Sequence, residues 1–323
     1  MEKLPSQDIL TFCLLGLYHA RMGFATREQL NRYYDLYKDV DVTFSKDVMQ
    51  ALCFNARQVC VRSAGGQCSC VMNSVSMVGA KVILSRKSSL LESIQVEGAS
   101  VSIRFSFFES DARDAVSFFV TARVLGVEDY AESTELVVLS VAYTQRIPDM
   151  LIERLGLLVE ANISSKKRKS ERIAVNKESM RRIGLMRAET IVFIQAIPRR
   201  CVLRDVSFGG AKFIMMGVAP FLKGKETVLK LDFEEPSTSM SIRGHVVRAD
   251  QVEGRKDLVA VAMEYDFDVV PVAYRMCLNR YASDRCRRFP GTDEDCSAAS
   301  AGDPGRSSAG AEGIDLSVPF SLS

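Results

Sequence analysis

The sequence predicts an α+β chain, mainly β with helices, in which two β-barrels follow one another. From Gly65 onward, apolar residues alternate with period two in runs rich in Val, Ser, Phe and Ile, and these runs are separated by turn-forming residues. The strands are evenly spaced and are not interleaved with long helices, which favours barrels over a parallel sheet. A length of 323 residues also suggests about two domains.

The composition is that of a globular protein with little net charge. Hydrophobic residues make up 47% and charged residues 25% of the chain, which is ordinary for domains that bury real cores. The formal net charge of +2 provides no global attraction to nucleic acid or to a membrane. Any basic binding site must therefore be local.

Cysteine and histidine usage argues against metal and acid–base chemistry. The nine cysteines are an odd number scattered through apolar sequence, as expected for free thiols in a reducing cytosol. Cys68-x-Cys70 is the only tight pair, and its spacing does not suit zinc. Histidine occurs only at positions 19 and 245, and the sequence contains no Walker-type glycine loop. We expect no cofactor, no metal and no enzyme activity.

The first 64 residues are expected to form helices that pack on the first barrel. Asp8 suits an N-cap before an apolar stretch, 9–17, that is too short to cross a bilayer and lacks the flanks of a signal peptide. We therefore expect a helix over 8–22 in a cytoplasmic protein without membrane insertion. Thr26 and Gln29 have capping-box spacing before a second helix, and Ser45 or Asp47 begins a third.

Two series of strands follow, and each ends in a helix that begins at a proline. We expect the first barrel and its helix over 65–161, a polar, serine-rich hinge over 162–172, the second barrel and its helix over 173–289, and a disordered tail over 290–323. The predicted strands are 67–84, 100–108, 115–126 and 136–144, then 190–196, 200–206, 211–216, 227–233, 240–249 and 258–265.

The two halves also resemble each other in sequence, which indicates an internal duplication. SVSMVGAKVIL (74–84) aligns with DVSFGGAKFIM (205–215) at an offset of 131 residues. VTARVLGVE (120–128) aligns with IRGHVVRAD (242–250), and LVVLSVAY (136–143) with LVAVAMEY (258–265), both at an offset of 122. Nine extra residues between these blocks in the first copy account for the difference in offset.

A candidate binding site combines the hinge with a turn about thirty residues later. Arg168 and Arg172 lie four positions apart, and the planar guanidinium pairs bidentately with phosphate or with the O6/N7 edge of guanine. Asp205 can accept from the N–H groups of guanine, and Ser207 adds a hydroxyl. Gly209 and Gly210, the last site residues of this turn, permit close approach of the backbone to a ligand. This combination predicts a site for an acidic purine nucleotide on the outer face of a barrel.

The pattern Arg168-x-x-x-Arg172 followed by Asp205-x-Ser207-x-x-Gly210 resembles the PilZ domain, a six-stranded β-barrel that binds cyclic di-GMP. The stretch 244–248, the strand over 261–265 and the C-terminal helix fit the same family, so the resemblance covers about 162–288. It implies that the two arginines clamp the ligand and that Asp205, Ser207 and Gly210 form the floor of the site. It also places Lys167 where the family sets whether one or two ligand molecules bind.

The first copy lacks the features that the resemblance assigns to the ligand. Ser74 occupies the column of Asp205, and the two arginine columns hold Tyr37 and Asp41, whereas Ser76 and Gly79 remain. We therefore expect a divergent PilZ-like module that does not bind the dinucleotide. The whole chain resembles the tandem PilZ proteins of the PlzA type, with two six-stranded barrels.

The leading functional hypothesis is a cyclic di-GMP receptor in which the ligand fixes the hinge and changes how the two modules sit relative to one another. An unidentified protein partner is expected downstream, and control of motility is an expectation for the family. The alternative is a nucleic-acid-binding barrel protein, although few aromatic residues are interleaved with its basic residues. Those basic residues are the 166–169 cluster together with Arg181, Arg182, Arg199 and Arg200.

Overall fold

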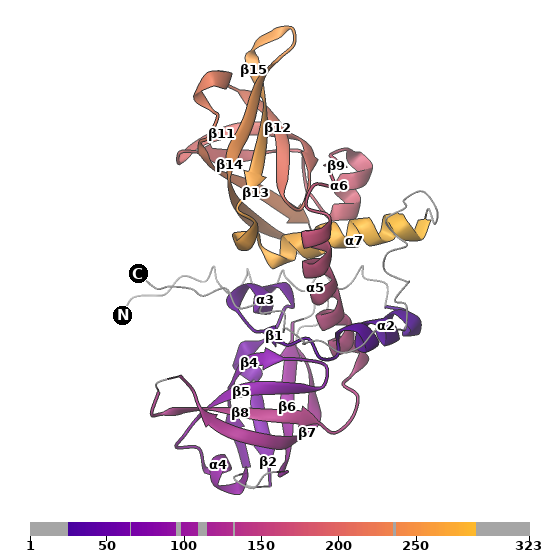
Figure 1. Ribbon diagram of the computed structural model, residues 1–323, viewed down its shortest axis with the longest axis vertical. Coiled ribbons are helices and arrows are strands. Elements are labelled where there is room, and N and C mark those ends of the chain that lie inside the picture. The colour runs from indigo at the N-terminus through magenta and orange to yellow at the C-terminus, as the bar shows by residue number, and fades with distance from the viewer. Residues whose placement is uncertain are drawn as a thin grey trace, which may run out of the picture.

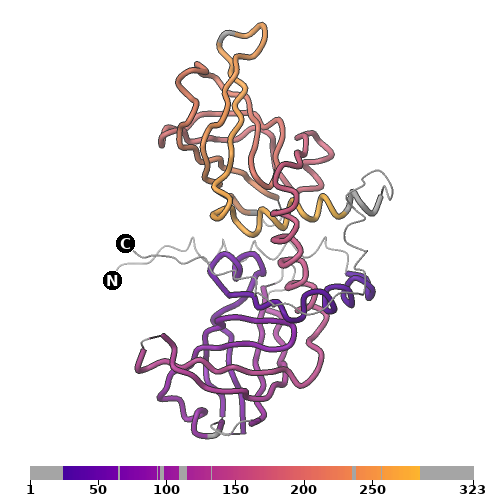
Figure 2. Tube along the Cα trace, in the orientation of Figure 1, coloured from indigo at the N-terminus to yellow at the C-terminus, as the bar shows by residue number. Residues whose placement is uncertain are grey.

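The computed structural model describes residues 25–64, 66–94, 98–108, 115–131, 133–234 and 237–288. Two barrels lie at opposite ends of the long axis, with helices between them (Figures 1 and 2). The expected helix over 8–22 and the expected disordered tail over 290–323 lie outside the described residues. Within them, no helix combines the length and the apolar character needed to cross a bilayer.

Within the described residues, two short helices lie near the start of the chain where the capping residues predicted them, one on each side of the first strand. Helix α2 (Arg27–Tyr37) begins after Thr26, whose hydroxyl accepts from the Gln29 N–H at 3.2 Å. Helix α3 (Lys46–Ala51) begins after Ser45, whose hydroxyl accepts from the Val48 N–H at 3.3 Å. A 3-10 turn, η2 (Ala56–Gln58), leads into the barrel.

The first barrel has the strand order β1-β4-β5-β8-β7-β6-β2-β3. Strands β3 and β4 flank the single residue Cys70, so one bent strand runs from β3 at one end of this order to β4, next to β1 at the other end. The Cys70 N–H donates to the Val59 carbonyl at 3.2 Å. The strands are β1 (Val42–Thr43), β2 (Cys60–Ser63), β3 (Gly66–Ser69), β4 (Val71–Val75), β5 (Gly79–Ser85), β6 (Ser100–Phe107), β7 (Val116–Asp129) and β8 (Leu136–Tyr143), with helix α4 (Ser89–Ile94) after β5.

The start of this barrel differs from the prediction. Residues 1–64 were expected to be helical, whereas β1 and β2 lie within this range and belong to the sheet. These strands have two and four residues, too few for an alternating pattern to stand out in the sequence. The predicted strand over 67–84 is three strands, because the chain kinks at Cys70 and turns at 76–78.

The second barrel is closed by six strands, as the resemblance implied. Its strand order is β10-β13-β14-β15-β12-β11-β9, and β10 also pairs with β11, which closes the ring. The strands are β9 (Ile173–Ala174), β10 (Glu189–Ile194), β11 (Ile197–Val206), β12 (Gly210–Met216), β13 (Glu226–Glu234), β14 (Ser237–Val252) and β15 (Arg255–Tyr265). The helices and 3-10 turns are α6 (Lys177–Ile183), η3 (Ala219–Phe221), η4 (Phe267–Val269) and α7 (Val272–Arg288).

The two barrels have the same plan, including their irregularities. Strands β4, β5, β7 and β8 occupy the places that β11, β12, β14 and β15 occupy in the second barrel. The register shifts also match: Met72/Ser74 corresponds to Leu203/Asp205 at the offset of 131, and Val124/Gly126 corresponds to Val246/Arg248 at the offset of 122. Shared bulges at aligned positions support the internal duplication, because bulges are specific features of a fold.

Helix α5 (Asp149–Lys167) connects the barrels and is longer than predicted. The sequence predicted a hinge over 162–172, but 162–167 continue the helix, so the hinge prediction is wrong for this part. The Ser165 side chain is buried and its hydroxyl donates to the Asn162 carbonyl at 2.8 Å, while Ile163 packs against the core. Because these side chains are held by helix packing, tertiary contacts override the polar composition of the segment.

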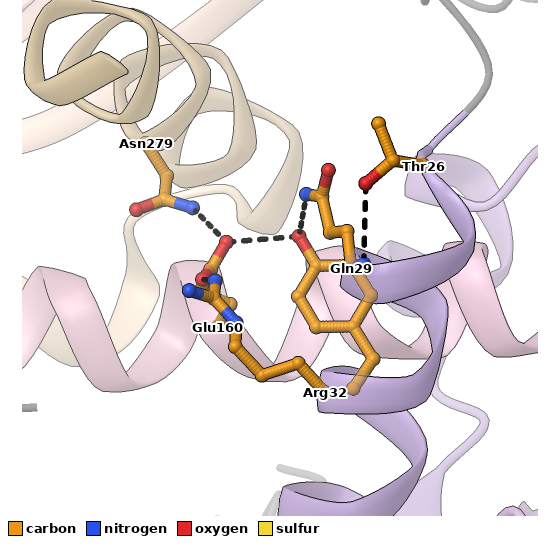
Figure 3. Close-up of polar contacts among 6 residues, drawn as sticks. Thr26, Gln29, Arg32, Glu160 and Asn279 are labelled. Carbon is orange, nitrogen blue, oxygen red and sulfur yellow. Dashed lines mark hydrogen bonds and ion pairs between the residues drawn. The ribbon is translucent and has the colours of Figure 1, made fainter. Parts of the chain in front are cut away.

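Glu160 on α5 joins three helices that belong to different parts of the chain (Figure 3). Its carboxylate accepts from Arg32 Nη2 at 2.8 Å and from the Tyr33 hydroxyl at 3.1 Å, both on α2. It also accepts from Asn279 Nδ2 on α7 at 3.3 Å. Burial, together with the Glu160 charge, raises the pKa of Tyr33, so that hydroxyl stays a proton donor. A helix near the first barrel is thereby tied to the last helix of the second.

Candidate ligand-binding site

The two predicted arginines lie where α5 meets the second barrel. Arg168 is the C-cap of α5, and its N–H donates to the Ser164 carbonyl at 2.8 Å. Arg172 directly precedes β9, and β9 pairs with the end of β11 through Ala174 and Asp205. This pairing brings the arginine segment beside the turn between β11 and β12.

Arg172 and Asp205 form an ion pair through Nη1 and Oδ1. The Arg172 side chain is 47% exposed and the Asp205 side chain 19% exposed, so the pair lies at the surface with its carboxylate partly sheltered. Arg168 Nε lies 3.8 Å from Glu171 Oε2. The segment 166–172 contains five basic residues and one acidic residue, which leaves a local excess of positive charge. An anion is therefore favoured at this place.

Ser207 and Gly210 form a buried turn. The Ser207 N–H and hydroxyl both donate to the Gly210 carbonyl, at 2.8 and 3.0 Å. A Cβ atom at Gly210 would lie 2.3 Å from the Met263 carbonyl oxygen, so the turn requires glycine there. The Tyr274 hydroxyl donates to the Ser207 carbonyl at 2.9 Å, and burial raises the pKa of Tyr274 so that this donor stays protonated.

The first barrel contains the same turn. The Ser76 N–H and hydroxyl donate to the Gly79 carbonyl at 2.9 and 3.4 Å, and a Cβ atom at Gly79 would lie 2.5 Å from the Val141 carbonyl oxygen. The serine and glycine of this motif therefore stabilise the fold in both barrels.

The charged positions differ between the barrels. In the first barrel the column of Arg172 holds Asp41, whose Oδ2 accepts from the Ser74 hydroxyl at 2.9 Å and lies 4.0 Å from Lys81 Nζ. Ser74 stands in the column of Asp205, so the same two positions are again in contact. The position of the Arg172 cation in the second barrel is held by the Asp41 anion in the first barrel, and this charge disfavours phosphate binding in the first barrel.

Comparisons with known proteins agree with this division into two modules. Residues 28–162 match the PilZN3 domain and residues 166–283 match the PilZ domain. A protein of Treponema denticola named "Cyclic di-GMP binding protein" is 46% identical over 306 residues, which cover 92% of this chain and 97% of that protein. The chain belongs to the PilZ-domain family.

Solved structures that match this chain include two complexes with c-di-GMP. The Borreliella burgdorferi PlzA protein in complex with c-di-GMP is 19% identical, with 79% of this chain and 98% of that chain covered and a TM-score of 0.35. Escherichia coli YcgR in complex with c-di-GMP is 12% identical, with 75% and 91% covered and a TM-score of 0.25.

The PilZ domain of this chain brings together part of the predicted site. Arg172 and Asp205 are in contact, Arg168 lies four residues before Arg172, and Lys167 ends α5 with an exposed side chain. Ser207 and Gly210 lie in the buried turn between β11 and β12. Among the residues that the structure describes, no three histidine, cysteine or acidic side chains lie where they could share a metal ion.

Sequence reasoning missed Lys169 of the arginine segment and its partner Glu264 on β15. Lys169 lies between the arginines, and its Nζ lies 3.2 Å from Glu264 Oε1 on β15. Its carbonyl accepts from the Gly209 N–H at 3.0 Å. The position of Lys169 inside the motif was visible in the sequence, but its partner on β15 depends on the closed barrel.

Proposed function

We propose that this chain is a non-enzymatic receptor for cyclic di-GMP and that its PilZ domain binds the ligand with Arg168, Arg172 and Asp205. The observation that carries the proposal is the Arg172–Asp205 pair beside the β11–β12 turn, which presents a guanidinium and a carboxylate together. The name of the Treponema denticola relative supports the identity of the ligand.

The ion pair explains how the site is held before the ligand arrives. A carboxylate beside Arg172 satisfies the guanidinium without neutralising the whole basic segment. A ligand that offers phosphate oxygens to Arg172 and N–H donors to Asp205 replaces one ion pair by two charge-assisted interactions. A mononucleotide with a single phosphate leaves fewer charges for the second arginine, so we expect it to bind more weakly.

The PilZN3 domain does not bind the dinucleotide in this proposal. Asp41 stands where the PilZ domain has Arg172, and it would repel a phosphate in the corresponding place. We therefore expect all binding to depend on the arginines of the PilZ domain.

Binding at Arg168 and Arg172 also changes the arrangement of the two domains in this proposal. Arg168 caps α5, and Glu160 lies eight residues earlier on the same helix, about 12 Å along its axis. A displacement of the capped end is therefore passed to a residue that contacts α2 and α7. The output, for which motility is one family-level candidate, requires a protein partner that recognises this arrangement.

Calorimetric titration of the full chain with cyclic di-GMP tests the proposal. The double variant Arg168→Ala, Arg172→Ala should lose at least about 100-fold in affinity, because each charge-assisted contact contributes about 1.5–3 kcal/mol. The control Arg199→Ala, Arg200→Ala removes the same charge from exposed residues at the far end of β11 and should bind as the wild type does. Unchanged affinity in the first variant would refute the assignment.

Two further measurements cover the remaining parts of the proposal. Small-angle scattering with and without the ligand should report a change in the radius of gyration, and identical curves would contradict the interdomain change. Chromatography of the nucleotide after long incubation should recover it intact, whereas its hydrolysis would contradict a non-enzymatic receptor. Nucleic-acid binding stays a prediction, and it requires an affinity that falls steeply with salt and ignores Asp205→Ala.

A further inference from the structure

Lys169 attaches the arginine segment to the barrel through both its backbone and its side chain. Its carbonyl accepts from the Gly209 N–H at 3.0 Å, in the turn that follows β11. Its ammonium lies 3.2 Å from Glu264 Oε1 and 5.6 Å from the centre of the Phe267 ring. Because Lys169 lies between the two arginines, these contacts fix the backbone from which both arginine side chains extend.

The backbone contact depends on the absence of a side chain at position 209. A Cβ atom there would lie 2.5 Å from Lys169 Cγ and 2.9 Å from the Lys169 carbonyl oxygen. Gly209 does not adopt the left-handed backbone conformation, so conformational freedom does not explain the residue. The Gly209 carbonyl also accepts from the Tyr265 N–H at 2.9 Å, which fixes the turn against β15. Close approach of Lys169 is what requires glycine here.

The side-chain contacts connect the same point to the helices. Arg275 on α7 lies over the Phe267 ring at 4.8 Å, so this ring has a cationic neighbour in both Lys169 and Arg275. Arg275 Nη1 also donates to Asn162 Oδ1 on α5 at 3.3 Å. The arginine segment thus contacts the barrel directly and is linked to α7 and α5 through Phe267 and Arg275.

We propose that Lys169 is a positioning residue for ligand binding and that Gly209 is required because it admits Lys169. The Lys169 clasp, defined as the contacts of Lys169 with Gly209, Glu264 and Phe267, seats the arginine segment before the ligand arrives. This inference rests on the proposed function. A seated segment spares the ligand the entropy cost of ordering it, and releasing even one backbone residue is expected to weaken binding about tenfold.

The test compares Gly209→Ala with Gly217→Ala in the full chain. A Cβ atom at Gly217 meets only Leu222 and Met215 side-chain atoms at 3.6 and 3.7 Å, so this control makes the same chemical change without a clash. Gly209→Ala should bind cyclic di-GMP about tenfold more weakly than the wild type, and the control should bind equally well. Trypsin should cleave the basic 166–172 segment faster in ligand-free Gly209→Ala than in the control.

A second variant tests the clasp without touching the buried turn. Glu264→Gln removes the charge that faces Lys169 from a side chain that is 46% exposed, so the fold should be retained. It should weaken binding about two- to fivefold and speed tryptic cleavage, because an exposed pair contributes little. If Gly209→Ala lowers the melting temperature sharply, the Glu264→Gln variant decides whether the Lys169 clasp supports ligand binding.

Three results would overturn the inference: wild-type affinity and wild-type cleavage in Gly209→Ala, equal weakening in Gly209→Ala and Gly217→Ala, or no effect of Glu264→Gln on either measurement. Failure of the wild-type chain to bind cyclic di-GMP would instead refute the proposed function. In that event the cleavage rates without ligand still decide whether Lys169 is clasped.

Discussion

Replacing Glu160 by glutamine tests the junction of α2, α5 and α7 directly. The Glu160 side chain is 16% exposed and accepts three hydrogen bonds, from Arg32, Tyr33 and Asn279 (Figure 3). Glutamine keeps the size of the side chain but has only one accepting oxygen atom. In its best orientation, that oxygen faces Tyr33 and Asn279, and the NH₂ group turns toward the Arg32 guanidinium, where it cannot accept.

The expected loss follows from these three contacts. A hydrogen bond to a charged group contributes about 1.5–3 kcal/mol and a neutral one about 0.5–1.5 kcal/mol, so each bond from Tyr33 and Asn279 loses about 1 kcal/mol. The pair with Arg32 adds about 0.5 kcal/mol, because Arg32 is 58% exposed. The free energy of unfolding should fall by about 2–3 kcal/mol, which corresponds to about 4–10 °C in the melting temperature.

Thermal unfolding followed by calorimetry measures this loss. Glu135→Gln is the matched control, because Glu135 is 72% exposed and its pair with Lys87 is at 3.1 Å on the surface. We expect the control to melt within about 1 °C of the wild type. If Glu160→Gln also melts within that margin, the carboxylate does not stabilise the helix junction and the reasoning above is wrong.

Two further substitutions test other parts of the molecule. The hydrogen bond from Arg187, at 2.9 Å, lowers the pKa of Asp232, so its stabilising contribution is present above the unfolded pKa of about 3.9 and is lost as the pH falls through the lower folded value. Asp232→Asn should therefore be less stable than the wild type in urea at pH 7, with a smaller difference at pH 3; an equal difference at both would contradict this. Gly79→Ala should lower stability by about 1–3 kcal/mol in thermal melts, because its Cβ would lie 2.5 Å from the Val141 carbonyl oxygen, and should leave the ligand affinity unchanged in calorimetry.

The strands could be predicted from the sequence because most of them follow a clear alternation. Strand β13, for example, alternates between buried residues and residues that are partly or fully exposed, and its predicted bounds of 227–233 differ from the observed Glu226–Glu234 by one residue at each end. Helix α6 was missed although Asn176 and Ser179 form a capping box at its start. It spans only seven residues, too few for a helical hydrophobic period to emerge.

The sequence predicted which residues belong to the candidate site, but it did not predict the contacts that each of them makes. The sequence could not show that the hydroxyl of Ser207 lies in a buried turn, because that depends on the bulge between Leu203 and Asp205. It also could not place Lys169 beside Glu264, since the two residues are 95 positions apart and meet only when β15 pairs with β12. Contacts of this kind follow from strand register rather than from local pattern.

Helix α5 explains why ligand binding and domain arrangement belong to one event in the proposed function. At the offset of 122 residues, α5 occupies the place in the first half of the chain that α7 occupies in the second. At the offset of 131, its end at Lys167 lies one residue from the place where α2 ends, at Tyr37. One helix is thus the last helix of the PilZN3 domain and the helix that leads into the PilZ domain. Because the Arg168 N–H donates to the Ser164 carbonyl and the neighbouring Ser165 is buried, a ligand that displaces Arg168 is expected, under the proposed function, to displace this end of the helix as well.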